Sequence, residues 1–335
     1  MNFEEIIQQI KHGKIAPIYF LHGEEPYFID KISETVQKHA LNDEERSFNE
    51  LIMYGKDTDS TNLVHAARQY PMGGKRQLII LREAQNLAKI EILENYFKAP
   101  LQSTVLVITY KYKSFDKRTK TYIALSKQPQ AVVFESKKLK ENEIYQWISK
   151  FITEKGLTIE PRASDMLIDF LGAELEKVAQ SVEKLTVALG HDKKLIRTDD
   201  VINNIGMSKE YNPFELQKAI INKDVMKANR IVKAFAANEK DYPIPMITTI
   251  LFSYFSKLLM YYYVSDKSPN TVMSELKVSY PAVDDYKRGA QNYKGTKLLE
   301  IISLLREYDM KSKGFGNVSA SHGDLLKELV FKIIH

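Results

Sequence analysis

Short β-rich apolar segments alternate with longer helix-like segments between residues 17 and 135, and this alternation constrains the fold more than any other feature of the chain. It is typical of a parallel sheet with helices on both faces. We therefore predict an α/β domain of three layers. The predicted strands span residues 17–22, 48–53, 77–82, 104–110 and 131–135, and the predicted helices span residues 27–40, 61–69, 90–97 and 117–126.

The β-rich pattern ends after residue 140, and the rest of the chain has the spacing of helices. Apolar residues recur at helical intervals between residues 171 and 185, and Thr198 begins an N-cap sequence before a further helix. A shift in composition near residues 206–213 separates this block from a longer helical one. Because 335 residues exceed what one core usually organises, we predict an α/β domain followed by two all-helical domains, at residues 1–140, 141–209 and 210–335.

The composition favours a cytoplasmic protein without membrane contact. The chain contains no cysteine, which excludes disulfides and thiol nucleophiles and fits a reducing compartment. Acidic residues near the N-terminus stand where a secretory signal would be basic. The most apolar run, residues 244–264, is interrupted by serine, threonine and lysine, which suits a buried helix better than a membrane span. The net charge of +5 permits contact with phosphates without requiring it.

The turn after the first predicted strand lies where a P-loop protein places its phosphate-binding loop. The motif requires a second glycine, a lysine and a hydroxyl residue at the positions that Phe28, Ile29 and Asp30 occupy here. Two glutamates in the turn would also repel a triphosphate. We predict a degenerate loop, no nucleotide hydrolysis, no catalytic residue, no metal and no cofactor. The loop consists of Gly23, Glu24, Glu25 and Pro26.

Several segments together resemble the delta subunit of the bacterial DNA polymerase III clamp loader. They are residues 18–29, 75–84, 175–185, 212–220 and 308–314, and they cover nearly the whole chain in order. The resemblance implies an AAA+-like first domain of the P-loop-NTPase type without nucleotide. It also implies that the second domain is a small helical lid and the third a helical collar that holds the subunit in a five-membered ring.

The resemblance further implies a role in DNA replication without intrinsic catalysis. In this family the first domain inserts a hydrophobic plug into the sliding clamp (beta) and opens it, while neighbouring subunits hydrolyse ATP. The implied partners are the clamp, the tau/gamma ATPase subunits, a delta-prime-type subunit and primed DNA. The DNA-directed DNA polymerase (nucleotidyltransferase) activity belongs to the whole holoenzyme.

The family's plug corresponds to the turn between the helix at 61–69 and the strand at 77–82. The residues alone favour a turn in which Met72 packs into the core. The resemblance favours a clamp contact with Tyr70 and Met72 as anchors. Many family members carry a second bulky apolar residue where Gly73 stands, so we expect a smaller plug or a larger part for Tyr70. The predicted site is Tyr70, Pro71, Met72 and Gly73.

Two further regions are candidates for contact with DNA. A basic segment at 111–140 suits phosphates or, alternatively, a solvated helix face. Phe315 stands between two glycines, where its ring is suited to stack on an unpaired base or to pack back on its own helix. The candidate residues are Lys111, Lys113, Lys117, Arg118 and Phe315.

Two other functions remain open at the level of the sequence. A divergent NTPase with an unorthodox loop would hydrolyse nucleotide as a pure chain. A stand-alone DNA-binding protein would bind DNA tightly without partners, through the basic segment.

Overall fold

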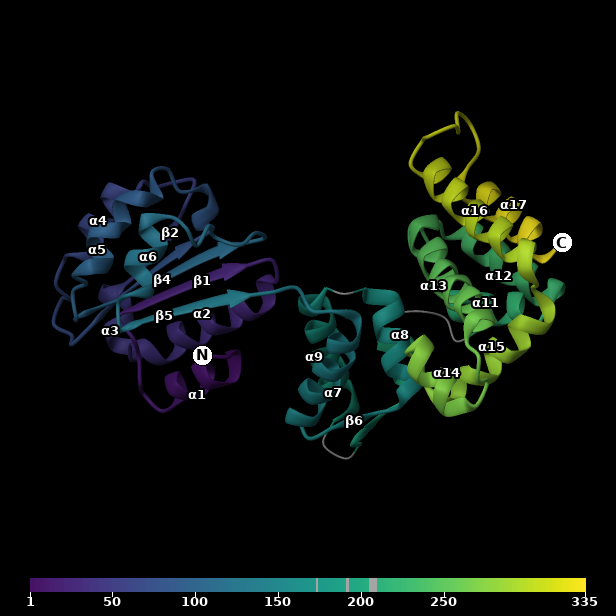
Figure 1. The fold of residues 1–335 in the computed structure, drawn as a ribbon, viewed down its shortest axis with the longest axis horizontal. Coiled ribbons are helices and arrows are strands. Elements are labelled where there is room, and N and C mark those ends of the chain that lie inside the picture. The colour runs from purple at the N-terminus through teal and green to yellow at the C-terminus, as the bar shows by residue number, and fades with distance from the viewer. Residues whose placement is uncertain (173, 191–192, 205–209) are drawn as a thin grey trace. The chain divides into compact units, whose positions relative to one another are not determined.

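The computed structural model describes residues 1–172, 174–190, 193–204 and 210–335. Its contacts divide the chain into two units, Met1–Leu139 and Lys140–His335 (Figure 1). The first unit is built on a sheet, and the second consists mainly of helices. The predicted α/β class of the first part and the largely helical character of the rest are both confirmed.

A parallel sheet of five strands forms the centre of the first unit, with the strand order β2-β3-β4-β1-β5. Every pairing between neighbours is parallel, as the buried apolar runs predict. The strands are β1 (Ile18–Gly23), β2 (Glu50–Tyr54), β3 (Gln77–Arg82), β4 (Thr104–Lys111) and β5 (Ala131–Ser136).

The sheet is covered on both faces because successive side chains of a strand point to opposite sides. Tyr19 and Leu21 of β1 pack in one core with α1 (Phe3–Lys11) and α2 (Pro26–Ala40). Ile18 and Phe20 pack in the other. That second core includes α4 (Ser60–Ala67), α5 (Leu93–Lys98) and α6 (Lys120–Ser126) (Figure 1).

The prediction of a strand at residues 48 and 49 is wrong, because these residues end a short helix, α3 (Asp43–Asn49). The Asn42 side chain accepts a hydrogen bond from the Glu45 N–H at 2.7 Å, and the Glu45 carboxylate accepts one from the Asn42 N–H at 3.4 Å. This capping box starts a helix. The strand therefore begins only at Glu50.

The second unit begins with four helices and a sheet of two very short strands. Its predicted all-helical character differs from the structure here, because β6 pairs with β7 and the Thr158 N–H donates to the Lys194 carbonyl at 2.7 Å. These elements are α7 (Glu141–Glu154), β6 (Thr158–Ile159), α8 (Pro161–Leu171), α9 (Leu175–Leu189), β7 (Leu195–Ile196) and α10 (Thr198–Asn204).

Seven further helices share one large core. The predicted division of this unit at residues 209 and 210 stays a prediction, and residue 209 lies outside the described residues. The helices are α11 (Pro213–Ile221), α12 (Val225–Ala237), α13 (Ile244–Tyr263), α14 (Pro269–Leu276), α15 (Tyr280–Asn292), α16 (Gly295–Ser312) and α17 (His322–Ile334).

Helix α13 is the apolar run noted in the sequence. Among the described residues, it alone is long and apolar enough to cross a membrane by length and composition. Its side chains Leu251, Phe255 and Leu258 are buried in the core shared with the other helices. The prediction of a buried helix is confirmed, and this burial accounts for its apolar character.

Candidate functional site

The segment between α4 and β3, residues 70–74, is called the tip segment from here on. The Tyr70 side chain is 76% exposed and the Met72 side chain is 71% exposed. Met72 is therefore not a core residue, which contradicts the alternative drawn from the sequence without the family. Pro71 and Gly73 lie beside these side chains, and Gly73 has a φ of +67° that favours glycine.

The buried amide of Asn49 fixes the backbone of the tip segment. The Met72 N–H donates to Asn49 Oδ1 at 2.7 Å, and Asn49 Nδ2 donates to the Met72 carbonyl at 3.1 Å. Asn49 lies 23 residues earlier in the chain and is buried. One side chain thus satisfies both backbone groups of Met72, as a neighbouring strand would. The backbone is held in place while the Met72 side chain stays in solvent.

Two other side chains hold the ends of the tip segment. The Glu45 carboxylate accepts a hydrogen bond from the Lys75 N–H at 3.4 Å, and a Cβ at Gly74 would lie 3.0 Å from the same carboxylate. At the other end, Gln77 Nε2 donates to the Ala66 carbonyl at 3.2 Å and to the Gln69 carbonyl at 2.5 Å. These contacts add a side-chain donor to the backbone turn at the end of α4, where the Ala66 carbonyl also accepts from the Gln69 N–H at 3.1 Å. Sequence reasoning identified neither these residues nor Asn49.

Residues of the chain itself occupy the space beside the degenerate phosphate loop. Gly23 has a φ of +141°, and a Cβ at this position would lie 1.9 Å from the Ser136 carbonyl oxygen. The carboxylate of Glu25, which is buried, accepts a hydrogen bond from the Tyr27 N–H at 3.0 Å. Ser136 Oγ donates to the Glu25 carbonyl at 2.7 Å. The N-terminus of α2, where a phosphate would bind, therefore already holds a negative charge.

The residues next to this loop are also engaged within the first unit. Asp30 stands where the motif requires a hydroxyl, and it accepts a hydrogen bond from Lys111 Nζ at 2.7 Å. His22 precedes the loop, and its Nδ1 accepts a hydrogen bond from the Phe115 N–H at 3.1 Å. Burial lowers the pKa of His22, so the neutral ring is favoured. Exposed Glu24 and the first residue of α2, Pro26, complete the loop.

Three of the four candidate cations of the basic segment have acidic partners. Besides Lys111, Lys117 Nζ lies 2.8 Å from Glu135 Oε2, and Arg118 Nη2 lies 2.9 Å from Asp116 Oδ2. The Arg118 hydrogen bonds lower the pKa of Asp116 to about 2. The fourth cation, Lys113, lies 5.4 Å from the centre of the Tyr110 ring. A role in DNA contact stays a prediction for all four.

The loop between α16 and α17 carries an exposed ring. The Phe315 side chain is 65% exposed, which argues against the alternative that it packs back on its own helix. Its N–H donates to the Met310 carbonyl at 3.0 Å, so the backbone is fixed at this point. The glycines on either side have φ values of +90° and +72°. The structure presents the ring to solvent, and base stacking stays a prediction.

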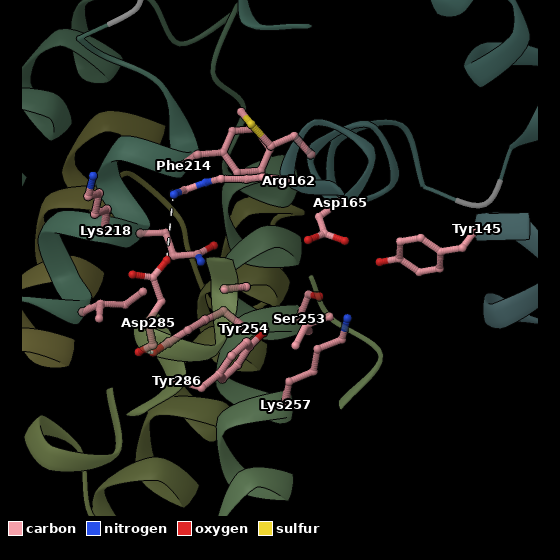
Figure 2. A pocket seen from close by; sticks show the side chains of 15 residues that line it. Tyr145, Arg162, Asp165, Phe214, Lys218, Ser253, Tyr254, Lys257, Asp285 and Tyr286 are labelled. Atoms are coloured by element: carbon pink, nitrogen blue, oxygen red, sulfur yellow. Dashed lines mark hydrogen bonds and ion pairs between the residues drawn. The ribbon is translucent and has the colours of Figure 1, made fainter. Parts of the chain in front are cut away.

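A small cavity of about 70 Å³ lies in the second unit, between α8 and helices α11, α13 and α15 (Figure 2). Arg162 of α8 points toward Asp285, with 3.9 Å between Nη2 and Oδ2. Asp165 accepts a weak hydrogen bond from the Ser279 N–H at 3.4 Å, and burial raises its pKa. A nucleotide is too large for this volume. The cavity is lined by polar side chains from several helices. Among the described residues, no group of three or more acidic or histidine side chains is placed to hold a metal.

Comparison with known proteins shows what the chain is similar to. Residues 19–137 match the family model described as "DNA polymerase III, delta subunit". The DNA polymerase III subunit delta of Bacillus subtilis is 26% identical over 322 residues, which cover 92% of this chain and 91% of that protein. The chain resembles the delta subunit of DNA polymerase III along most of its length.

Two further comparisons find the same similarity. A probable DNA polymerase III subunit delta of Aquifex aeolicus is 23% identical over 231 residues, covering 64% of this chain and 62% of that one. The solved structure of a Bacillus subtilis DNA clamp loader delta protein has a TM-score of 0.60 and 23% identity, and the match covers 99% of both chains. That likeness shows a common fold along the whole chain.

The delta subunit that the chain resembles is a non-catalytic component, and the phosphate loop of this chain is occupied by its own residues. The resemblance predicted from the sequence is confirmed, together with the fold class. The comparisons assign no role to individual residues, so the tip segment remains a candidate site.

Proposed function

We propose that this chain binds the ring-shaped DNA sliding clamp and opens it during DNA replication. It acts as one subunit of a clamp loader in which other subunits hydrolyse ATP. The observation that supports this function most directly is the tip segment, where two large apolar side chains are exposed on a backbone held by Asn49.

A rigid apolar tip is suited to binding because little conformational entropy is lost when it enters a groove. The Asn49 hydrogen bonds order the Met72 backbone before any partner arrives. Opening follows if the clamp surface that accepts the tip is better formed in the open ring than in the closed one, because a ligand shifts an equilibrium only by its difference in affinity. Binding energy alone then drives opening, and this chain needs no nucleotide.

The proposed partners follow from the same role. The chain assembles with other clamp-loader subunits, namely tau/gamma-type ATPase subunits and a delta-prime-type subunit, and meets primed DNA within that assembly. The proposed location of the chain is the cytoplasm, where such an assembly would meet the DNA. Phe315 and the basic segment are proposed DNA contacts, of which Phe315 is the better candidate because its ring is exposed while three of the four cations are paired.

The test is binding of the purified chain to the sliding clamp of the same organism, without nucleotide. Met72→Ala should weaken binding by about tenfold to a hundredfold, the usual effect of removing a central interface anchor. Met226→Ala is a matched control, because Met226 of α12 is equally exposed at 74%. Equal affinity of Met72→Ala and the wild type would show that the tip segment does not bind the clamp. Failure of the wild type to bind would refute the proposed function itself.

A further inference from the structure

The tip segment alone offers little area for a stable complex. A standard interface buries roughly 800 Å² on each partner. A tyrosine buries about 150–250 Å², and Met72 adds a smaller side chain. Gly73 contributes no side chain where many family members have a bulky one. Additional apolar surface next to the tip segment is therefore needed for binding of ordinary strength.

Phe48 is a large apolar residue connected to the tip segment through its neighbour Asn49. It is the residue before Asn49 at the end of α3, and it is 72% exposed. The other residues of α3, Asp43-Glu44-Glu45-Arg46-Ser47 and Asn49, are all charged or polar. Burying a phenylalanine on binding is worth about 1.5–3 kcal/mol, and free Phe48 leaves that gain unused.

The hydrogen bonds of Asn49 make α3 and the tip segment one rigid piece. Asn49 holds both backbone groups of Met72, and Glu45, one turn earlier, accepts from the Lys75 N–H. The space beside Gly74 is closed by the side chains of the same two residues, at 3.0 and 3.1 Å from a Cβ placed there. Phe48 and Met72 are thus fixed in relation to each other, although 23 residues separate Asn49 from Met72.

Two further exposed apolar residues follow Phe48 in the chain. Leu51 and Ile52 belong to β2, which is an edge strand, and both are exposed. An edge strand with exposed apolar side chains is unusual in a protein that acts alone. Leu51 and Ile52 are successive residues of β2 and point to opposite faces of the sheet, so Phe48 is the exposed apolar residue that lies next to Asn49 in the chain.

We propose that Phe48 is a second anchor for the sliding clamp and supplies the apolar contact that Gly73 lacks. This inference rests on the proposed function, since it names the same partner. The clamp covers α3 and the tip segment together, with Met72 and Phe48 as the two main anchors and Tyr70 beside them. Asn49 is a positioning residue between the two anchors.

The experiment measures clamp binding by Phe48→Ala, Met72→Ala and the wild type under the same conditions. Phe48→Ala should weaken binding at least about tenfold. Phe331→Ala is the matched control, because Phe331 also lies on a helix, in the second unit, and is 62% exposed. Unchanged thermal unfolding of Phe48→Ala is expected, since alanine favours a helix and the lost ring is exposed. Phe48→Leu should keep most of the affinity, because leucine retains an apolar anchor.

A second readout uses the absence of cysteine from the chain. In Phe48→Cys the new thiol is the only one, and saturating clamp should slow its alkylation at least about tenfold compared with Phe331→Cys. Wild-type binding that Met72→Ala weakens and Phe48→Ala leaves unchanged would overturn the second anchor and leave the proposed function standing. Equal alkylation of Phe48→Cys with and without clamp would overturn it in the same way. A wild type that does not bind the clamp overturns both proposals.

Discussion

In two turns of the first unit a buried polar side chain bonds the backbone, but the results are opposite. In the degenerate phosphate loop, the buried Glu25 carboxylate accepts a backbone N–H at the start of α2 and occupies the place of a ligand. In the tip segment, the buried Asn49 amide bonds both backbone groups of Met72 and leaves the side chain in solvent. A buried polar side chain that satisfies backbone groups can therefore fill one turn and present the side chain of another to solvent. The difference lies in whether the backbone it holds faces inward or outward.

In the degenerate phosphate loop, the largest loss of stability is expected from a substitution at Gly23. A Cβ here would lie 1.9 Å from the Ser136 carbonyl, so Gly23→Ala should lower the free energy of unfolding by about 3 kcal/mol or more. Chemical denaturation measures the change. Gly13→Ala is the control, because Gly13 also has a positive φ but no atom within 4 Å of a Cβ, and its cost should be only about 1 kcal/mol. Similar losses in both variants would show that backbone angle rather than crowding decides.

In the tip segment, the largest effect on the backbone is expected from a substitution at Asn49. Asn49→Ala removes both hydrogen bonds to Met72, so the free energy of unfolding should fall by about 1–3 kcal/mol. Clamp affinity should fall about tenfold as well, since the tip then has to be ordered on binding. Met72→Ala provides the contrast, with weaker binding at an unchanged free energy of unfolding. Full clamp affinity of a folded Asn49→Ala protein would refute the positioning role.

A smaller change separates charge from crowding in the phosphate loop. Glu25→Gln keeps an acceptor for the Tyr27 N–H and removes the negative charge from the helix N-terminus. The free energy of unfolding should fall by about 0.5–1 kcal/mol. Equilibrium dialysis with ATP and magnesium should still show no binding, because the Ser136 carbonyl remains beside Gly23. ATP binding by this variant would mean that charge alone closes the loop.

The smallest effect is expected from pH, at His22. Burial lowers its pKa in the folded state, and the ring accepts from the Phe115 N–H only when Nδ1 is unprotonated. The unfolded chain therefore binds the proton more readily. The stability contributed by His22 is fully present above its ordinary pKa of 6.5 and is lost as the pH falls below that value.

Denaturation midpoints of the wild type and His22→Asn, compared across this range, check the prediction. Asparagine keeps an acceptor for the Phe115 N–H and does not titrate. The difference between the two proteins should change below pH 6.5. A constant difference would show that folding does not change the pKa of His22.

The sheet could be predicted from the sequence because its strands are buried on both faces and are therefore continuously apolar. The error at residues 48 and 49 arose because Phe48 fits a strand as well as a helix. The capping box of Asn42 and Glu45 was the local signal for the helix. The candidate site could also be predicted only in part. Exposure of Met72 followed from the resemblance, while its attachment to Asn49 depends on a contact between distant residues that no local pattern reveals.

The charges of the basic segment show the same limit. Asp116 and Glu135 lie within that segment, so pairing with Arg118 and Lys117 could have been expected from proximity in the chain. The pairing of Lys111 with Asp30 joins residues 81 positions apart, and it required the fold. Formal charge in a sequence therefore overstated the positive surface available to DNA.

The attachment of Met72 through its main chain has a consequence for variation at this position. Asn49 recognises only an N–H and a carbonyl, which every residue except proline provides. The position of the residue-72 backbone therefore does not depend on which side chain stands there. Under the proposed function, residue 72 is free to change as the groove of the clamp changes, while the backbone contacts with Asn49 stay the same. A library of side chains at this single position would serve to retune the protein toward clamps of other species.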